Sequence, residues 1–247
     1  MKKMKISKYI FVCVLVVILA AIFSIPFGCD KQQEGDNSNL EPSKDEVPPI
    51  YLFDYAGLTV VTMVFRRQLD SKEFTVKFAL FEEDAPETCE NFKTLVLAGH
   101  YDGSLIHRLV KENIYIIQGG GYKLVPKDDG SNNMILKKLD SIAPITNEYN
   151  DNNEWVTKGG NNTIQHEAGV IAMARTDNPA ITTDQFYFNF NDNLEFNNRY
   201  AAFGKCIDKV SLLNLVELGK SETETIADGF ADFPIPIIEV VAVTIDE

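Results

Sequence analysis

The stretch Ile106-His107-Arg108-Leu109-Val110, followed by Ile116-Ile117-Gln118-Gly119-Gly120, decides the fold together with two later segments. The later segments are Gly169-Val170-Ile171-Ala172-Met173-Ala174-Arg175 with Asp184-Gln185-Phe186-Tyr187-Phe188-Asn189, and Ala201-Ala202-Phe203-Gly204-Lys205. Each run is short, apolar and bounded by glycine or polar residues, which is typical of β-strands. The pattern predicts strands over residues 114–118, 169–174, 186–190 and 201–206.

The same pattern continues on both sides of these segments. Residues 58–65 are dense in β-branched side chains, and residues 74–81 alternate so that Phe74, Val76, Phe78 and Leu80 share one face. Residues 237–245 predict a further strand. The charged residues 66–73 predict a hairpin connection between the first two strands.

Two helices are predicted among the strands. The first begins near Pro86 and ends near Gly99, because proline suits a first helical turn and glycine suits a helix end. The second spans about residues 209–218, whereas the polar residues 122–163 are predicted as loops. Many short strands with two helices indicate a closed β-barrel, although these patterns alone do not separate it from an open sandwich.

The three opening segments resemble the cyclophilin family in order and spacing. They are similar to its Phe-His-Arg … Gln-Gly-Gly, Gly-x-(Ile/Leu)-(Ala/Ser)-Met-Ala … Ser-Gln-Phe-Phe-Ile and Phe-Gly-Lys segments. Supporting matches are Ala85-Pro86-Glu87-Thr88, Glu90-Asn91-Phe92, Tyr101-Asp102-Gly103 and Asn147-Glu148. The resemblance covers about residues 59–245. It implies a mainly β fold, a closed eight-stranded antiparallel barrel capped by two α-helices, within a domain over residues 50–247.

The resemblance also implies peptidyl-prolyl cis–trans isomerase activity without a cofactor or metal. The sequence itself gives no metal-ligand spacing, because His100, His107 and His166 do not cluster with cysteines or carboxylates. Rotation about a peptide bond is opposed by a barrier of ~18–20 kcal/mol, and no bond is broken. A hydrogen-bond donor that favours the twisted amide therefore suffices, and no nucleophile is needed.

Arg108 matches the catalytic arginine of the family, and a guanidinium supplies the fixed, charged donor that the twisted amide nitrogen requires. Gln118 matches the glutamine that orders this arginine and the substrate carbonyl. The same resemblance implies an apolar proline pocket and an adjoining groove. The pocket residues are Tyr115, Ile116, Met173, Tyr187 and Phe196, with Tyr200 at the pocket rim. The groove is lined by Gln185 and Ala174.

This chain departs from the usual cyclophilin pattern at several of these positions. Tyr187 replaces a phenylalanine, so its hydroxyl needs a partner if it is buried. Glu195 stands where many members have a tryptophan, and Tyr200 stands where many have a histidine. We expect altered peptide preference and weak cyclosporin binding. A weakly active or inactive module that binds proline-containing segments is the alternative function.

The first 29 residues predict an export signal. Four lysines in residues 1–8 precede an uncharged run over residues 9–27, which is typical of such signals. The run ends at Ile25-Pro26-Phe27-Gly28-Cys29, which resembles a bacterial lipobox and implies lipidation of Cys29. An uncleaved transmembrane anchor is the alternative. Both place the chain on the outer side of a membrane in the bacterial cell envelope, facing the periplasm or the exterior.

Residues 30–49 are polar and acidic and predict a flexible linker. The formal net charge of -13 argues against a general nucleic-acid binder, because a phosphate backbone requires a basic surface. Cys89 and Cys206 predict buried free thiols, with a disulfide between them as the alternative. The expected partners are proline-containing segments of exported proteins and the membrane, and the expected state is a monomer.

Overall fold

The main sheet closes on itself because β4 (Ile114–Pro126) pairs with both β3 (Ser104–Glu112) and β8 (Ile181–Asn189). This arrangement is seen in a computed structural model that describes residues 53–128, 133–140, 142–149, 164–175, 178, 181–226 and 230–246. The predicted export signal with Cys29 and the predicted linker lie outside the described residues.

Eight strands form the closed ring, and every neighbouring pair is antiparallel. The order around the ring is β4, β3, β12 (Ile238–Ile245), β1 (Val60–Arg67), β2 (Lys72–Leu80), β9 (Ala202–Cys206), β7 (Val170–Arg175) and β8. Two short strands extend it, β5 (Met134–Lys138) beside β4 and β6 (Ile145–Thr146) beside β8, and a separate small sheet pairs β10 (Glu222–Ile226) with β11 (Phe230–Ile235). The predicted eight-stranded barrel is confirmed.

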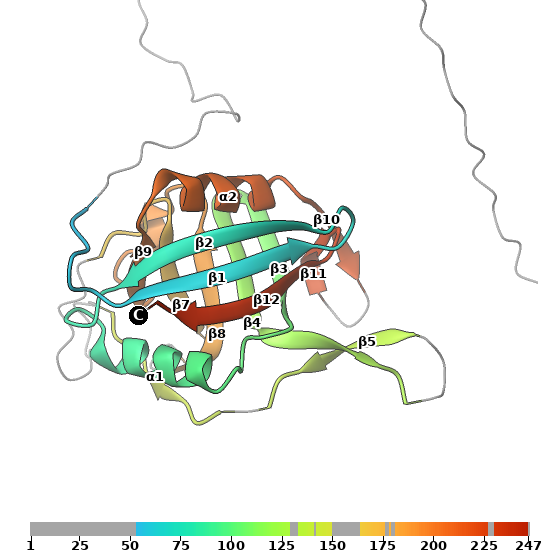
Figure 1. Ribbon diagram of the computed structural model, residues 1–247, viewed down its shortest axis with the longest axis horizontal. Coiled ribbons are helices and arrows are strands. Elements are labelled where there is room, and N and C mark those ends of the chain that lie inside the picture. The colour runs from blue at the N-terminus through green and yellow to red at the C-terminus, as the bar shows by residue number, and fades with distance from the viewer. Residues whose placement is uncertain are drawn as a thin grey trace, which may run out of the picture. The chain divides into compact units, whose positions relative to one another are not determined.

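Helices α1 (Pro86–Leu97) and α2 (Lys209–Gly219) lie on opposite sides of the barrel (Figure 1). The first turn of α1 is closed by the buried Glu148, whose carboxylate accepts hydrogen bonds from the backbone N–H of Glu87 (3.1 Å) and of Thr88 (2.7 Å). The α2 helix is capped by Asp208, which accepts from the backbone N–H of Ser211 at 2.7 Å. The two predicted helices are therefore present. The α2 helix is capped by the residue that precedes it, whereas α1 is capped by a residue distant in the sequence.

Strand alternation sorts the apolar side chains into two sets. One set fills the barrel interior, where the predicted face Phe74, Val76, Phe78 and Leu80 lies. Aromatic rings dominate this core and meet edge to face, for example Phe78 with Phe188 at 5.3 Å between ring centroids. The second set lies on the outer side of β4, β7, β8 and β9 and is described with the site below.

The prediction of loops over residues 122–163 was wrong in its described part, which contains the end of β4 and all of β5 and β6. The register pairs Lys123 with Lys137 and Leu124 with Leu136 across a two-stranded ribbon. Strand β5 consists of three apolar residues followed by two lysines, so it has no period of two that the sequence could reveal. The thiol prediction is confirmed, since Cys89 and Cys206 are free and buried.

Candidate active site

The β3–β4 hairpin brings the two central predicted residues together. Arg108 and Gln118 are direct cross-strand partners, and Nη1 of Arg108 donates to Oε1 of Gln118 at 3.4 Å. Gln118 in turn donates from Nε2 to Oε1 of Gln185 at 2.9 Å, which links β4 to β8. The result is a row of three polar side chains across neighbouring strands, with the exposed Arg108 at one end.

An apolar cluster borders this row on the outer side of the barrel. Strand β8 places Tyr187 opposite Gln118, and Ile116 precedes Gln118 by two residues on the same face of β4. We call this group the outer cluster. Its buried members are Ile116, Val170, Ala172, Tyr187 and Ala202, and its partly buried members are Val110, Ile114, Ile164, Ala174, Phe196 and Tyr200.

Three aromatic rings form the most tightly associated part of the outer cluster. Tyr187 contacts Phe196 at 5.8 Å and Tyr200 at 5.6 Å, and Phe196 contacts Tyr200 at 4.9 Å, all between ring centroids. Phe196 belongs to the short 3₁₀ helix η1 (Leu194–Phe196), which also carries the exposed Glu195. The guanidinium of Arg175 lies 4.9 Å from the centre of the Tyr200 ring, so a second cation stands at the edge of the cluster.

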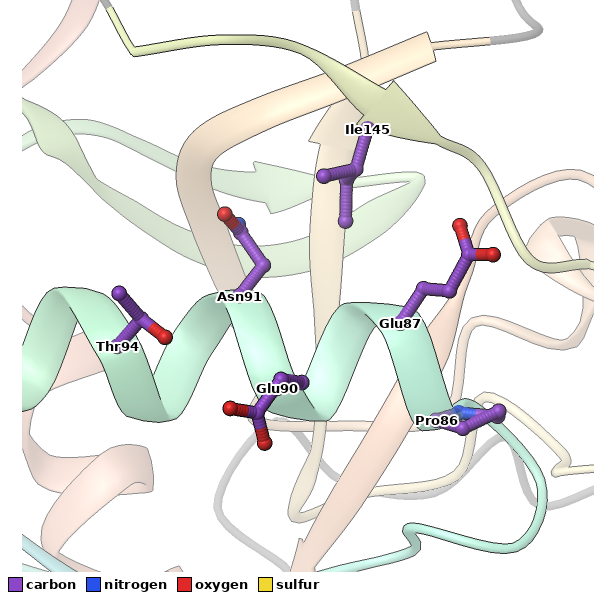
Figure 2. A pocket seen from close by; sticks show the side chains of 6 residues that line it. All are labelled: Pro86, Glu87, Glu90, Asn91, Thr94 and Ile145. Atoms are coloured by element: carbon purple, nitrogen blue, oxygen red, sulfur yellow. The ribbon is translucent and has the colours of Figure 1, made fainter.

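A separate groove of about 460 Å³ lies along α1 beside β6 and is lined by Pro86, Glu87, Glu90, Asn91, Thr94 and Ile145 (Figure 2). Its charged side chains are the carboxylates of Glu87 and Glu90, which accept hydrogen bonds and cannot donate them when ionised. It shares no residue with the Arg108 row or the outer cluster. We therefore take the Arg108 row with the outer cluster, and not this groove, as the candidate active site.

Comparison with known proteins decides the family. The family model described as "Cyclophilin type peptidyl-prolyl cis-trans isomerase/CLD" matches residues 66–242 of this chain. The chain belongs to this family. The assignment agrees with the closed barrel, and it makes the chain a cyclophilin-type peptidyl-prolyl isomerase.

Two relatives of this cyclophilin are bacterial isomerases. Peptidyl-prolyl cis-trans isomerase cyp18 of Streptomyces antibioticus is 30% identical over 183 residues, covering 69% of this chain and 93% of that protein. Peptidyl-prolyl cis-trans isomerase B of Escherichia coli K12 is 30% identical over 145 residues, covering 56% and 74%. A crystal structure of a cyclophilin type isomerase from Cryptosporidium parvum shares the fold, with a TM-score of 0.53, 20% identity, and coverage of 77% and 98%.

Two residues expected in the proline pocket lie elsewhere in this cyclophilin. Met173 is fully buried in the barrel core, because its neighbours Ala172 and Ala174 point outward and strand residues alternate. Tyr115 also turns inward, where its ring packs on Phe190 at 5.8 Å. Ile114, which the sequence analysis did not select, takes the outward position next to Ile116.

The structure brings the other expected residues together. Ile116, Tyr187, Phe196, Tyr200 and Ala174 belong to the outer cluster, and Gln185 belongs to the polar row. Within the part of the chain that the structure describes, no group of three or more His, Cys, Asp or Glu side chains could hold a metal ion.

Sequence reasoning missed His166, which lies directly behind the outer cluster. Its ring is almost parallel to that of Tyr187, at 18°, and its Nδ1 lies 3.3 Å from the Tyr187 hydroxyl. Burial lowers the pKa of His166 to about 4, so the ring is neutral near pH 7. His166 thus supplies the partner that the buried Tyr187 hydroxyl needs. No local pattern joins two residues that are 21 positions apart.

Proposed function

We propose that this cyclophilin catalyses prolyl isomerisation through Arg108, with the proline ring held on the outer cluster. The observation that carries the proposal is the polar row of Arg108, Gln118 and Gln185 running beside that cluster. An apolar surface for a proline ring and a charged donor next to it are the two elements that the reaction requires.

Arg108 acts on the amide nitrogen during rotation. A planar amide nitrogen offers no lone pair, whereas the nitrogen of a twisted amide is pyramidal and accepts a hydrogen bond. A guanidinium donor therefore stabilises the transition state more than either ground state, which lowers the barrier. Gln118, held by Gln185 on its far side, keeps the arginine oriented, and no proton has to be transferred.

We further propose that the clients are exported proteins and that the N-terminus tethers the enzyme to a membrane. The support is the predicted export signal with its lipobox-like end at Cys29. No helix among the described residues is long and apolar enough to cross a membrane. Mass spectrometry of the N-terminus after expression in a bacterial host should find an acylated Cys29, and an intact Met1 would contradict lipidation.

The catalytic proposal is tested by measuring isomerisation of a short Ala-Pro peptide with the full chain in detergent. Arg108→Ala should lower kcat/KM by about 10²- to 10³-fold, the usual effect of removing one transition-state donor. Arg66→Ala is the matched control, since Arg66 is on β1 and pairs with Glu73 at 2.8 Å, away from the polar row. Equal activities of the Arg108 and Arg66 variants would overturn the proposal.

A second function has one observation in its favour. Glu195 is exposed on η1 beside the outer cluster and places a negative charge where an apolar peptide would lie. This charge favours a second function, in which the chain binds proline-containing segments with little turnover. Peptide binding without any acceleration of isomerisation in the unmutated chain would favour this function over catalysis.

A further inference from the structure

A buried polar network lies behind the outer cluster and is centred on His166. Besides its contact with Tyr187, the ring of His166 approaches the backbone carbonyl oxygen of Tyr200 with Nε2, at 3.3 Å. The side-chain amide of Asn189 reaches Nδ1 at 3.5 Å. His166 and Asn189 are both almost completely buried, so these polar atoms are shielded from solvent.

The chemistry of the neighbours fixes the tautomer of His166. The Tyr200 carbonyl oxygen can only accept, so Nε2 must carry the proton. A neutral imidazole has a single N–H, which leaves Nδ1 as an acceptor. The Tyr187 hydroxyl therefore donates to Nδ1, and His166 bonds two of the three aromatic residues that form the centre of the outer cluster.

Asn193 extends the network to the β3–β4 hairpin. Its side chain accepts from the backbone N–H of Tyr115 at 2.7 Å and donates to the carbonyl oxygen of the same residue at 3.0 Å. It also donates to Oδ1 of Asn189 at 2.7 Å, and its backbone N–H donates to the carbonyl oxygen of His166 at 2.8 Å. The strand that carries Ile114 and Ile116 is thereby joined to the residues around His166.

We propose that His166 is a positioning residue for the isomerase reaction. It holds the Tyr187 ring and the Tyr200 backbone in place, so that the surface of the outer cluster stays complementary to the proline ring. The inference rests on the proposed function. His166 itself is almost completely buried, so it acts through Tyr187 and Tyr200 and not on the substrate directly. A tyrosine at position 187 and a neutral histidine at position 166 then form a functional pair.

The test compares His166→Leu, Tyr187→Phe and the double variant as full chains in detergent. His166→Leu leaves the buried Tyr187 hydroxyl without its acceptor, so kcat/KM should fall roughly tenfold. Tyr187→Phe removes the same hydrogen bond from the other side and changes the outer cluster itself, so it serves as the reference for the double variant. Adding His166→Leu to Tyr187→Phe should change kcat/KM by less than about threefold, because no Tyr187 hydroxyl is left for His166 to hold.

Two further readouts separate positioning from general stability. His166→Leu should raise KM with little change in kcat, because holding the proline ring affects ground state and transition state alike. Val76→Ala is the stability control, since it truncates a core side chain on β2 outside the outer cluster. That variant should lower the melting temperature and leave KM unchanged.

Each outcome decides the proposal. A KM for the double variant close to that of Tyr187→Phe supports it. An unchanged KM in folded His166→Leu, or a further roughly tenfold rise in KM when His166→Leu is added to Tyr187→Phe, would overturn it. Arg108→Ala is measured in the same series, so failure of the catalytic proposal shows as an unaltered kcat in that variant. If the unmutated chain has no turnover, the dissociation constant of the Ala-Pro peptide replaces KM and decides the role of His166.

Discussion

At the scale of single residues, the site depends on how closely strands β4 and β8 approach each other. The side chain of Gln185 lies against the backbone of Gly121, and a Cβ atom added at Gly121 would come within 2.5 Å of Nε2 of Gln185. Gln185 is the residue that holds Gln118, which in turn contacts Arg108. Glycine at position 121 therefore leaves room for the side chain of Gln185, the last residue of the polar row.

Gly121→Ala should reduce kcat/KM by roughly tenfold, because the new methyl group displaces Gln185 and releases Gln118. The control is Gly57→Ala, where an added Cβ would contact nothing within 4 Å but the φ of +82° strains an alanine, so this variant shows the effect of backbone strain without displacement of Gln185. Isomerisation of the Ala-Pro peptide provides the measurement. Full activity of folded Gly121→Ala would show that Gln185 does not support the arginine.

At the scale of elements, strand pairing and the alternation of strand faces explain which site residues could be predicted from the sequence. Arg108 and Gln118 could be predicted because their segments resemble those of the cyclophilin family, and the structure pairs the two residues within one hairpin. Met173 and Tyr115 were misplaced because matching a family segment does not state which face of a strand each residue occupies. The contact of His166 with Tyr187 joins separate elements and depends on barrel closure, which no local pattern encodes.

The cap of α1 gives a prediction at this scale. Glu148→Ala should lower the free energy of unfolding by about 2 kcal/mol, since two backbone N–H groups of the first turn lose their acceptor. Urea unfolding monitored by circular dichroism measures the change. Glu90→Ala, on the exposed side of the same helix, should change stability by less than about 0.5 kcal/mol. Equal effects of the two substitutions would contradict a capping role for Glu148.

At the scale of the whole molecule, two buried neutral histidines make stability depend on pH. Burial lowers the pKa of both His107 and His166 from 6.5 to about 4. Unfolded histidines bind protons below about pH 6.5, whereas the folded ones stay neutral down to about pH 4. The unfolded state therefore binds more protons in this window, and stability falls as the pH drops through it.

The free energy of unfolding should decrease from about pH 7 to about pH 4, with up to about 3 kcal/mol lost for each histidine. The lowered pKa values of Asp184 and Asp246 add to this loss only at the acid end of the window, where unfolded aspartates begin to bind protons. Urea unfolding at several pH values should give a shallower slope for His166→Leu. Identical slopes with and without His166 would contradict its burial in the neutral form.

The central claim is that Arg108 stabilises the twisted amide and does not merely bind the peptide. The most direct measurement is nuclear magnetic resonance of an Ala-Pro peptide with the full chain and with Arg108→Ala, giving both the cis–trans exchange rate on the protein and the dissociation constant. The account predicts that exchange slows by about 10²-fold or more while affinity changes by less than about threefold. Unchanged exchange on the variant, or a loss of affinity as large as the loss of exchange, would contradict it.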